Sequence, residues 1–169
     1  TVLPDGGIQM AGRSLPPAAQ EPIEGLGQAR QRFVETLDQV VADQLLADVP
    51  VGVFLSGGID SSLVLGSAAR CAARLPTFSI GFRQIGENPE RFDESDVARV
   101  VASYFKSDHH EIQVQPDDVF GRLDAVRTGV DEPNADPAVI PLDVLAGFAS
   151  RHVKVCLSGD GGDELFGGY

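Results

Sequence analysis

The sequence predicts an α/β fold, a doubly wound parallel sheet preceded by an N-terminal helix. Short apolar segments alternate along the chain with longer segments of helical periodicity. This alternation is typical of βαβ units, in which parallel strands are buried between two layers of helices. The 169 residues suffice for one ordinary domain, and a hydrophobic content of 43% is enough to form its core.

The chain begins with an irregular segment that leads into a helix. Residues 1–22 are rich in Pro and Gly and lack periodicity, which indicates a linker. Residues 24–47 then carry apolar side chains at helical spacing. We therefore expect a linker over residues 1–22 and a domain over residues 23–169, the latter truncated at its C-terminus.

Four short apolar segments are the expected strands, and they are Val51–Leu55, Thr77–Phe82, Glu111–Val114 and Val153–Leu157. Helical periodicity predicts the connecting helices at residues 61–75, 94–105, 116–130 and 142–152. Asp93 is the expected N-cap of the second of these helices.

The composition is strongly acidic, which excludes several kinds of partner. Thirteen Lys and Arg against 25 Asp and Glu give a formal charge of −12. Cationic residues are what nucleic acids and anionic membrane surfaces attract, so we expect neither partner. If an anionic ligand binds, backbone N–H groups or a metal ion must supply most of the positive potential.

The two cysteines, Cys71 and Cys156, match no metal-binding or redox spacing. Each lies in an apolar helix or strand pattern, so both are expected to be buried free thiols. Together with the lack of a signal peptide or a long apolar run, this indicates a reducing, cytoplasmic setting. Because the chain opens on Thr1 and stops in a glycine-rich run at Tyr169, we expect a fragment of a longer polypeptide.

Two glycine-rich loops follow the first and last expected strands. They are Ser56–Ser62 (SGGIDSS) and Ser158–Glu164 (SGDGGDE). In open parallel sheets, ligands bind at the carboxyl ends of the strands, where the strand order reverses. If the strands run in the order 3-2-1 and the fourth lies beside the first, the two loops meet in one crevice.

The residue types of these loops fit a magnesium-bound nucleoside triphosphate. Glycines allow close backbone approach, and N–H groups that lead into a helix form an anion cradle. Asp60 and Asp163 would repel phosphates directly but suit Mg²⁺ as oxygen ligands. The first loop lacks the lysine of a Walker A loop, and neither Ser56 nor Ser158 lies in a G-x-S-x-G nucleophile elbow.

The SGGIDSS loop resembles the PP-loop of ATP pyrophosphatases, which split ATP between its α- and β-phosphates to adenylate a substrate. Three further segments, residues 92–112, 131–141 and 157–169, are similar to the synthetase domain of glutamine-hydrolysing asparagine synthetases. The similarity runs from Glu24 to Tyr169. It implies the adenine nucleotide α-hydrolase form of the doubly wound sheet, and a ligase that uses ATP and Mg²⁺.

The resemblance also implies roles for individual residues. It places the adenosine at Leu55 and Ile80, and the pyrophosphate end at Ser56, Gly57, Gly58, Asp60 and Ser61. It places the α-phosphate region at Ser158 and Gly159, and Mg²⁺ at Asp60 and Asp163. Asp160 would assist ammonia attack or organise the phosphates. Many relatives carry Glu there, one methylene longer.

The implied reaction activates the side-chain carboxyl of aspartate as β-aspartyl-AMP, and ammonia then gives asparagine, AMP and pyrophosphate. In such glutamine amidotransferases the ammonia comes from glutamine, through an N-terminal glutaminase domain that these 169 residues lack. In this family, the lysine that neutralises the departing pyrophosphate follows the segment that corresponds to Phe166–Tyr169, which is where the present sequence stops. We therefore expect the isolated chain to be weakly active or inactive. A homodimer is the candidate assembly.

Other interpretations stay open at this stage. A related amidotransferase or a β-lactam-forming synthetase would adenylate another carboxylate, and a non-catalytic nucleotide-binding module would keep the loops alone. His109 and His110, adjacent on a strand, should point to opposite faces, so structural roles are favoured over a metal site. Asp131, Glu132 and Asp136 are either solvated or line the aspartate or ammonia side of the cleft.

Overall fold

The computed structural model describes residues 25–82, 94–129, 136 and 138–168. The chain divides inside helix α1 (Leu26–Leu45) into two compact units, Thr1–Val34 and Glu35–Tyr169. The described part of the first unit is the beginning of α1, and the expected linker over residues 1–22 lies outside the described residues. Within the described part of the chain, no helix is both long and apolar enough to cross a membrane.

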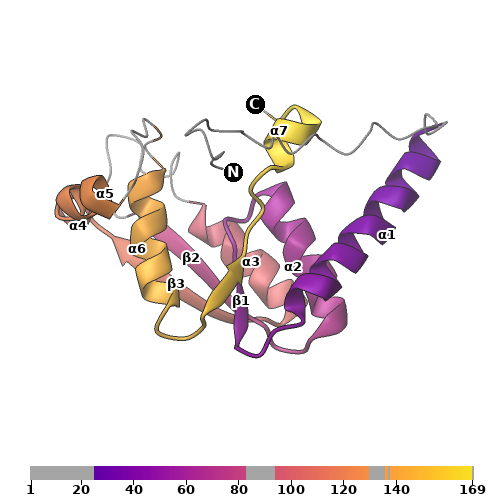
Figure 1. Ribbon diagram of the computed structural model, residues 1–169, viewed down its shortest axis with the longest axis horizontal. Helices are drawn as coiled ribbons and strands as arrows, with labels where there is room; N and C mark the ends of the chain where they lie inside the picture. Colours follow the sequence, from indigo (N-terminus) through magenta and orange to yellow (C-terminus); the bar gives the residue numbers. More distant parts are fainter. Residues whose placement is uncertain (1–24, 83–93, 130–135, 137, 169) are drawn as a thin grey trace, which may run out of the picture. The chain divides into compact units, whose positions relative to one another are not determined.

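The second unit is built on one sheet of four parallel strands (Figure 1). They are β1 (Val51–Phe54), β2 (Pro76–Phe82), β3 (Asp108–Val114) and β4 (Val155–Leu157). Their order in the sheet is β3-β2-β1-β4, so Val53 on β1 lies between Thr77 and Leu157. The predicted strand order is confirmed, and the order reverses between β1 and β4.

The helices connect these strands as the sequence predicts, with differences in their bounds. The helices that follow α1 are α2 (Ile59–Cys71), α3 (Ser95–Phe105), α4 (Pro116–Phe120), α5 (Leu123–Gly129), α6 (Val139–Ala149) and α7 (Gly162–Phe166). The expectation of one helix over residues 116–130 is wrong. The helix is interrupted at Gly121, a residue with low helix propensity, and two shorter helices form instead. Helix α6 begins before Pro141, which sits in the first turn, where no N–H is needed. Asp93 lies outside the described residues.

One face of the sheet packs against α2 and α3, with Val41 of α1 in the same cluster. Val53 and Leu55 from the β1 segment are almost fully buried there against Leu65 of α2 and Ala98 of α3. The second-unit part of α1 is further held by Asp38, which accepts a 2.7 Å hydrogen bond from the Ser67 hydroxyl and pairs with Arg70. This layer fixes the helix that carries the first loop.

The opposite face is covered by α6 (Figure 1). Its centre is Phe78 on β2, which is fully buried and meets Phe148 of α6 edge-on, with ring centroids 6.1 Å apart. Helices α4 and α5 also lie between β3 and β4 in the chain and contact α6, while α6 itself packs on β2.

Strand β3 begins at Asp108, earlier than the sequence predicts, because neighbouring residues satisfy its polar side chains. His109 lies 2.9 Å from the Thr77 hydroxyl and 3.3 Å from the Ser79 hydroxyl through its two ring nitrogens. The His110 ring instead stacks on Phe78, with centroids 5.4 Å apart. The two histidines thus point to opposite faces and contact structural partners, as predicted.

The expectation of two buried thiols is wrong for Cys71. This residue closes helix α2 and is exposed, whereas Cys156 on β4 is half-buried beside Phe78 and α6. An apolar helical pattern does not say which residue falls on the solvent side of the last turn. Burial raises the pKa of the Cys156 thiol to about 11, which keeps it protonated and unreactive at neutral pH.

His109 gives the fold a predictable pH dependence. Burial disfavours the imidazolium and lowers the pKa of His109 below its usual value of 6.5, against a smaller opposing effect of Glu111. Below pH 6.5 the unfolded chain therefore binds a proton that the folded chain does not, so stability falls as the pH drops through this window. Replacing His109 by Gln should remove this slope, which is at most about 1.4 kcal/mol per pH unit, in urea unfolding followed below pH 7. An unchanged slope would show that other groups cause it.

Candidate functional site

The first loop is organised by hydrogen bonds among its own serines. The Ser61 hydroxyl is buried, accepts a bond from the Ser56 N–H at 3.3 Å and lies 3.0 Å from the Ser56 hydroxyl. Ser62 donates its hydroxyl to the Gly58 carbonyl at 2.7 Å. Ser56 itself is exposed, so the loop presents one serine outward while another holds its shape.

The second loop lies directly against the first. A methyl group placed on Gly159 would lie 2.7 Å from the Ser61 nitrogen and 3.0 Å from the Asp60 carbonyl carbon. A methyl group on Gly162 would lie 2.4 Å from the Cγ of Asp60. The Gly159 contact is with backbone atoms and requires glycine, whereas the Gly162 contact is with the Asp60 side chain; together they show that the second loop packs closely on the start of α2. The predicted meeting of the two loops is confirmed.

Helix α3 supports the first loop from the other side. Gly57 adopts φ +90°, a conformation that favours glycine, and its Cα faces the beginning of α3. A methyl group on Gly57 would lie 2.8 Å from the Ala98 nitrogen and 2.9 Å from the Val97 Cβ. The loop therefore has rigid neighbours on two sides, α3 and the second loop.

The start of α2 has the features of an anion-binding position. Its N-cap is Gly58, which has no side chain to cap the first-turn N–H groups, and α2 runs for 13 residues behind it. The positive end of the helix dipole thus lies beside a loop that contains two glycines. The carboxylate of Asp60 lies in the same turn, and a bound cation would relieve its repulsion of an anion.

The two residues assigned to adenosine are not brought together by their side chains. The Leu55 side chain is 1% exposed and packs in the cluster on the α2 and α3 face. Ile80 belongs to the cluster on the α6 face. Leu55 can therefore contact a ligand only through its main chain, and the adenosine role of both residues remains a prediction.

The carboxylates of the site fit Mg²⁺ as a companion of phosphate rather than as a caged ion. The Asp60 carboxylate is half-buried beside Gly162, whereas Asp163 is exposed and its carboxylate turns toward Gly168. Among the described residues no group of three or more His, Cys, Asp or Glu side chains could hold a metal. One or two carboxylates plus substrate phosphates are the usual donors for Mg²⁺, so the residues present fit a phosphate-borne ion.

Asp160 and Ser158 interact within the second loop. The Ser158 hydroxyl donates a 2.9 Å hydrogen bond to the exposed Asp160 carboxylate. The turn that follows is closed by the Gly162 N–H, which bonds to the Gly159 carbonyl at 3.3 Å. Asp160 is thereby oriented by a neighbour, and its catalytic role remains a prediction. Asp131 and Glu132 lie outside the described residues, while Asp136 accepts the Ala138 N–H at 2.8 Å.

The sequence reasoning missed three residues that shape the site. Val97 lies against Gly57, Gly162 leaves room for the Asp60 carboxylate, and a methyl group on Gly168 would lie 1.8 Å from an Asp163 oxygen. The repeated glycines of SGDGGDELFGG were a visible signal for the last two. No pattern in the sequence indicates the contact of α3 with the first loop.

The sheet order and the two touching loops define a PP-loop type α/β protein of the adenine nucleotide α-hydrolase fold. An NH₃-dependent NAD synthetase from Campylobacter jejuni, solved in complex with the nitrate ion, shares this fold. Its TM-score is 0.53 at 16% identity, and the match covers 82% of this chain and 60% of that one. The family model for asparagine synthase matches residues 32–169. The chain belongs to the asparagine synthase family.

Curated relatives agree with this assignment. An asparagine synthetase of the glutamine-hydrolysing type from Bacillus subtilis strain 168 is 38% identical over 173 aligned positions, which cover 100% of this chain and 26% of that protein. A relative from Mycobacterium tuberculosis strain H37Rv is 45% identical over 143 residues, covering 84% of this chain and 21% of that protein. The chain thus spans about a quarter of the length of these relatives.

Proposed function

We propose that this chain forms the nucleotide-binding part of an ATP-dependent ligase that makes asparagine from aspartate. The observation that carries the proposal is the contact between the Ser56–Ser62 and Ser158–Glu164 loops at the carboxyl ends of neighbouring strands. Family membership supports the same conclusion. The glutaminase domain, the cytoplasmic setting and a homodimer belong to this proposal for the whole protein.

In the proposed reaction, a carboxylate oxygen of aspartate attacks the α-phosphorus of ATP and pyrophosphate leaves. Ammonia then attacks the acyl carbon of β-aspartyl-AMP, which releases AMP and leaves an amide in place of the acyl phosphate. The chain forms no covalent bond in either step, so its contribution is positioning and charge neutralisation.

The loops divide these tasks. The backbone N–H groups of Gly57, Gly58 and the uncapped start of α2 donate hydrogen bonds to the β- and γ-phosphates, and the exposed Ser56 hydroxyl donates another. Ser61 keeps the loop in shape through its bonds to Ser56 and Gly58. Ser158 and Gly159 contact the nucleotide near the α-phosphate. Mg²⁺, held by Asp60 and Asp163, would neutralise charge on the departing pyrophosphate.

The test is ATP–pyrophosphate exchange by the complete protein with aspartate and with a panel of other carboxylates. Exchange that requires aspartate is expected. Exchange with another carboxylate alone would keep the adenylation chemistry but contradict the asparagine product. ATP binding without any exchange would contradict the ligase and favour a nucleotide-binding module. The 169-residue chain alone is expected to exchange poorly, and robust exchange would refute that part.

A further inference from the structure

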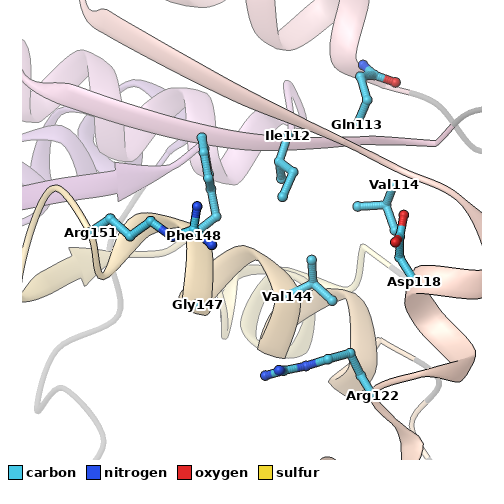
Figure 2. A pocket seen from close by; sticks show the side chains of 9 residues that line it. All are labelled: Ile112, Gln113, Val114, Asp118, Arg122, Val144, Gly147, Phe148 and Arg151. Carbon is cyan, nitrogen blue, oxygen red and sulfur yellow. The ribbon is translucent and has the colours of Figure 1, made fainter.

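A second candidate site lies away from the loops, in a cavity of about 510 Å³ between β3 and α6 (Figure 2). Ile112 on β3 and Val144 on α6 face each other across it. We call it the β3–α6 cavity. Strand β2 separates β3 from β1, so the cavity is distinct from the crevice that the two loops form. Its volume lies within the range of small-molecule sites.

The walls of the cavity are mostly apolar. Ile112 and Phe148 are half-buried and belong to the cluster around Phe78, while Val114 at the end of β3 is 1% exposed. Phe148 is held edge-on against Phe78, so this wall is supported from within the core. This apolar part of the cavity wall is therefore continuous with the cluster around Phe78.

Gly147 keeps the cavity open on the α6 side. Glycine inside a helix lowers stability relative to alanine, so it is normally found where a backbone must approach closely. Here no atom lies within 4 Å of the position that a Cβ would take, and Gly147 lines the cavity. The missing side chain therefore preserves space rather than a packing contact.

Two of the three charged groups that line the cavity have partners within the described part of the chain. Arg122 binds Asp143 through Nε at 2.6 Å and a second guanidinium nitrogen at 2.5 Å. Asp118 accepts the Gln115 N–H at 2.9 Å in the capping box of α4. In the part of the chain that the structure describes, no carboxylate pairs with the guanidinium of Arg151, which follows α6 and lines the other end of the cavity (Figure 2).

We propose that the β3–α6 cavity binds a small molecule with an apolar body and a single carboxylate, which pairs with Arg151. A guanidinium matches a carboxylate in geometry and charge, and the apolar body would cover Ile112, Val144 and Phe148. A phosphate dianion would need more donors than one unpaired arginine provides. A cationic ligand could pair only with Asp118, whose carboxylate already accepts the Gln115 N–H, and would be repelled by Arg122 and Arg151. This site is independent of the proposed ligase reaction.

The test uses two probes with the same carbon skeleton, 4-phenylbutyrate and 4-phenylbutan-1-ol, in calorimetric titrations of the intact protein. The acid is expected to bind at least about tenfold more tightly than the alcohol, because only the acid pairs with Arg151. Arg151→Gln should remove that difference and leave the alcohol affinity unchanged. Gly147→Leu should weaken both probes by at least about tenfold, because the new side chain fills the cavity.

Arg127→Gln is the matched control, since Arg127 is an exposed arginine on α5 outside the lining and pairs with Asp124. It should change neither affinity. Far-UV circular dichroism and the midpoint of urea unfolding establish whether each variant is folded. If Gly147→Leu does not fold, the result for Arg151→Gln decides the proposal. Equal affinities for acid and alcohol, an Arg151→Gln variant that keeps the difference, or no binding of either probe would each overturn the proposal.

Discussion

Replacing Asp60 by Asn is expected to weaken the magnesium-dependent binding of ATP by at least about a hundredfold, or ~2.7 kcal/mol. Asn keeps the size of the group that packs against Gly162, so the contact between the loops is retained. It removes the negative charge that a divalent cation requires from its oxygen ligands. The measurement is calorimetry of ATP on the intact protein, with and without Mg²⁺.

The change in ATP affinity that Asp60→Asn causes without Mg²⁺ distinguishes loss of a metal ligand from general damage to the site. In the absence of Mg²⁺, Asp60→Asn should leave ATP binding unchanged or tighten it, because one charge that repels phosphate is gone. Asp124→Asn is the matched control, since Asp124 on α5 is almost fully exposed and the change in net charge is the same. If Asp60→Asn lowers affinity equally with and without Mg²⁺, the metal-ligand role is wrong.

The strand order and the meeting of the loops could be predicted because they follow from general rules of parallel sheets. Val51–Leu55 and Val153–Leu157 are short apolar segments, each followed by a Ser-Gly loop. Ligand sites in open sheets form where the strand order reverses. The contact of Gly159 with the Asp60–Ser61 peptide is the physical result of that rule.

Other features could not be predicted, because they depend on tertiary contacts. Strand β3 extends over His109 and His110 only because Thr77, Ser79 and Phe78 on the neighbouring strand receive them. Local pattern alone favoured a shorter strand. Leu55 comes directly after strand β1, and its side chain is buried in the core. A residue that was assigned to ligand contact therefore does not offer its side chain to a ligand.

A second large effect is expected for Gly159→Ala. The new methyl group would lie 2.7 Å from the Ser61 nitrogen and 3.0 Å from the Asp60 carbonyl carbon, and both are backbone atoms that cannot rotate away. The second loop must therefore shift off the start of α2. We expect a loss of ~1–3 kcal/mol in the free energy of unfolding, as is typical of overpacking, measured by urea denaturation.

The same shift should weaken ATP binding at least about tenfold even where the protein is fully folded. The two loops could then no longer contact the nucleotide at the same time. Gly129→Ala at the end of α5 is the control: no atom lies within 4 Å of its Cβ position, so stability and affinity should be unchanged or slightly raised. A Gly159→Ala protein that loses stability but keeps wild-type ATP affinity would show that the nucleotide uses the Ser56–Ser62 loop alone. The contact between the loops would then serve the fold, and the proposed nucleotide roles of Ser158 and Gly159 would be wrong.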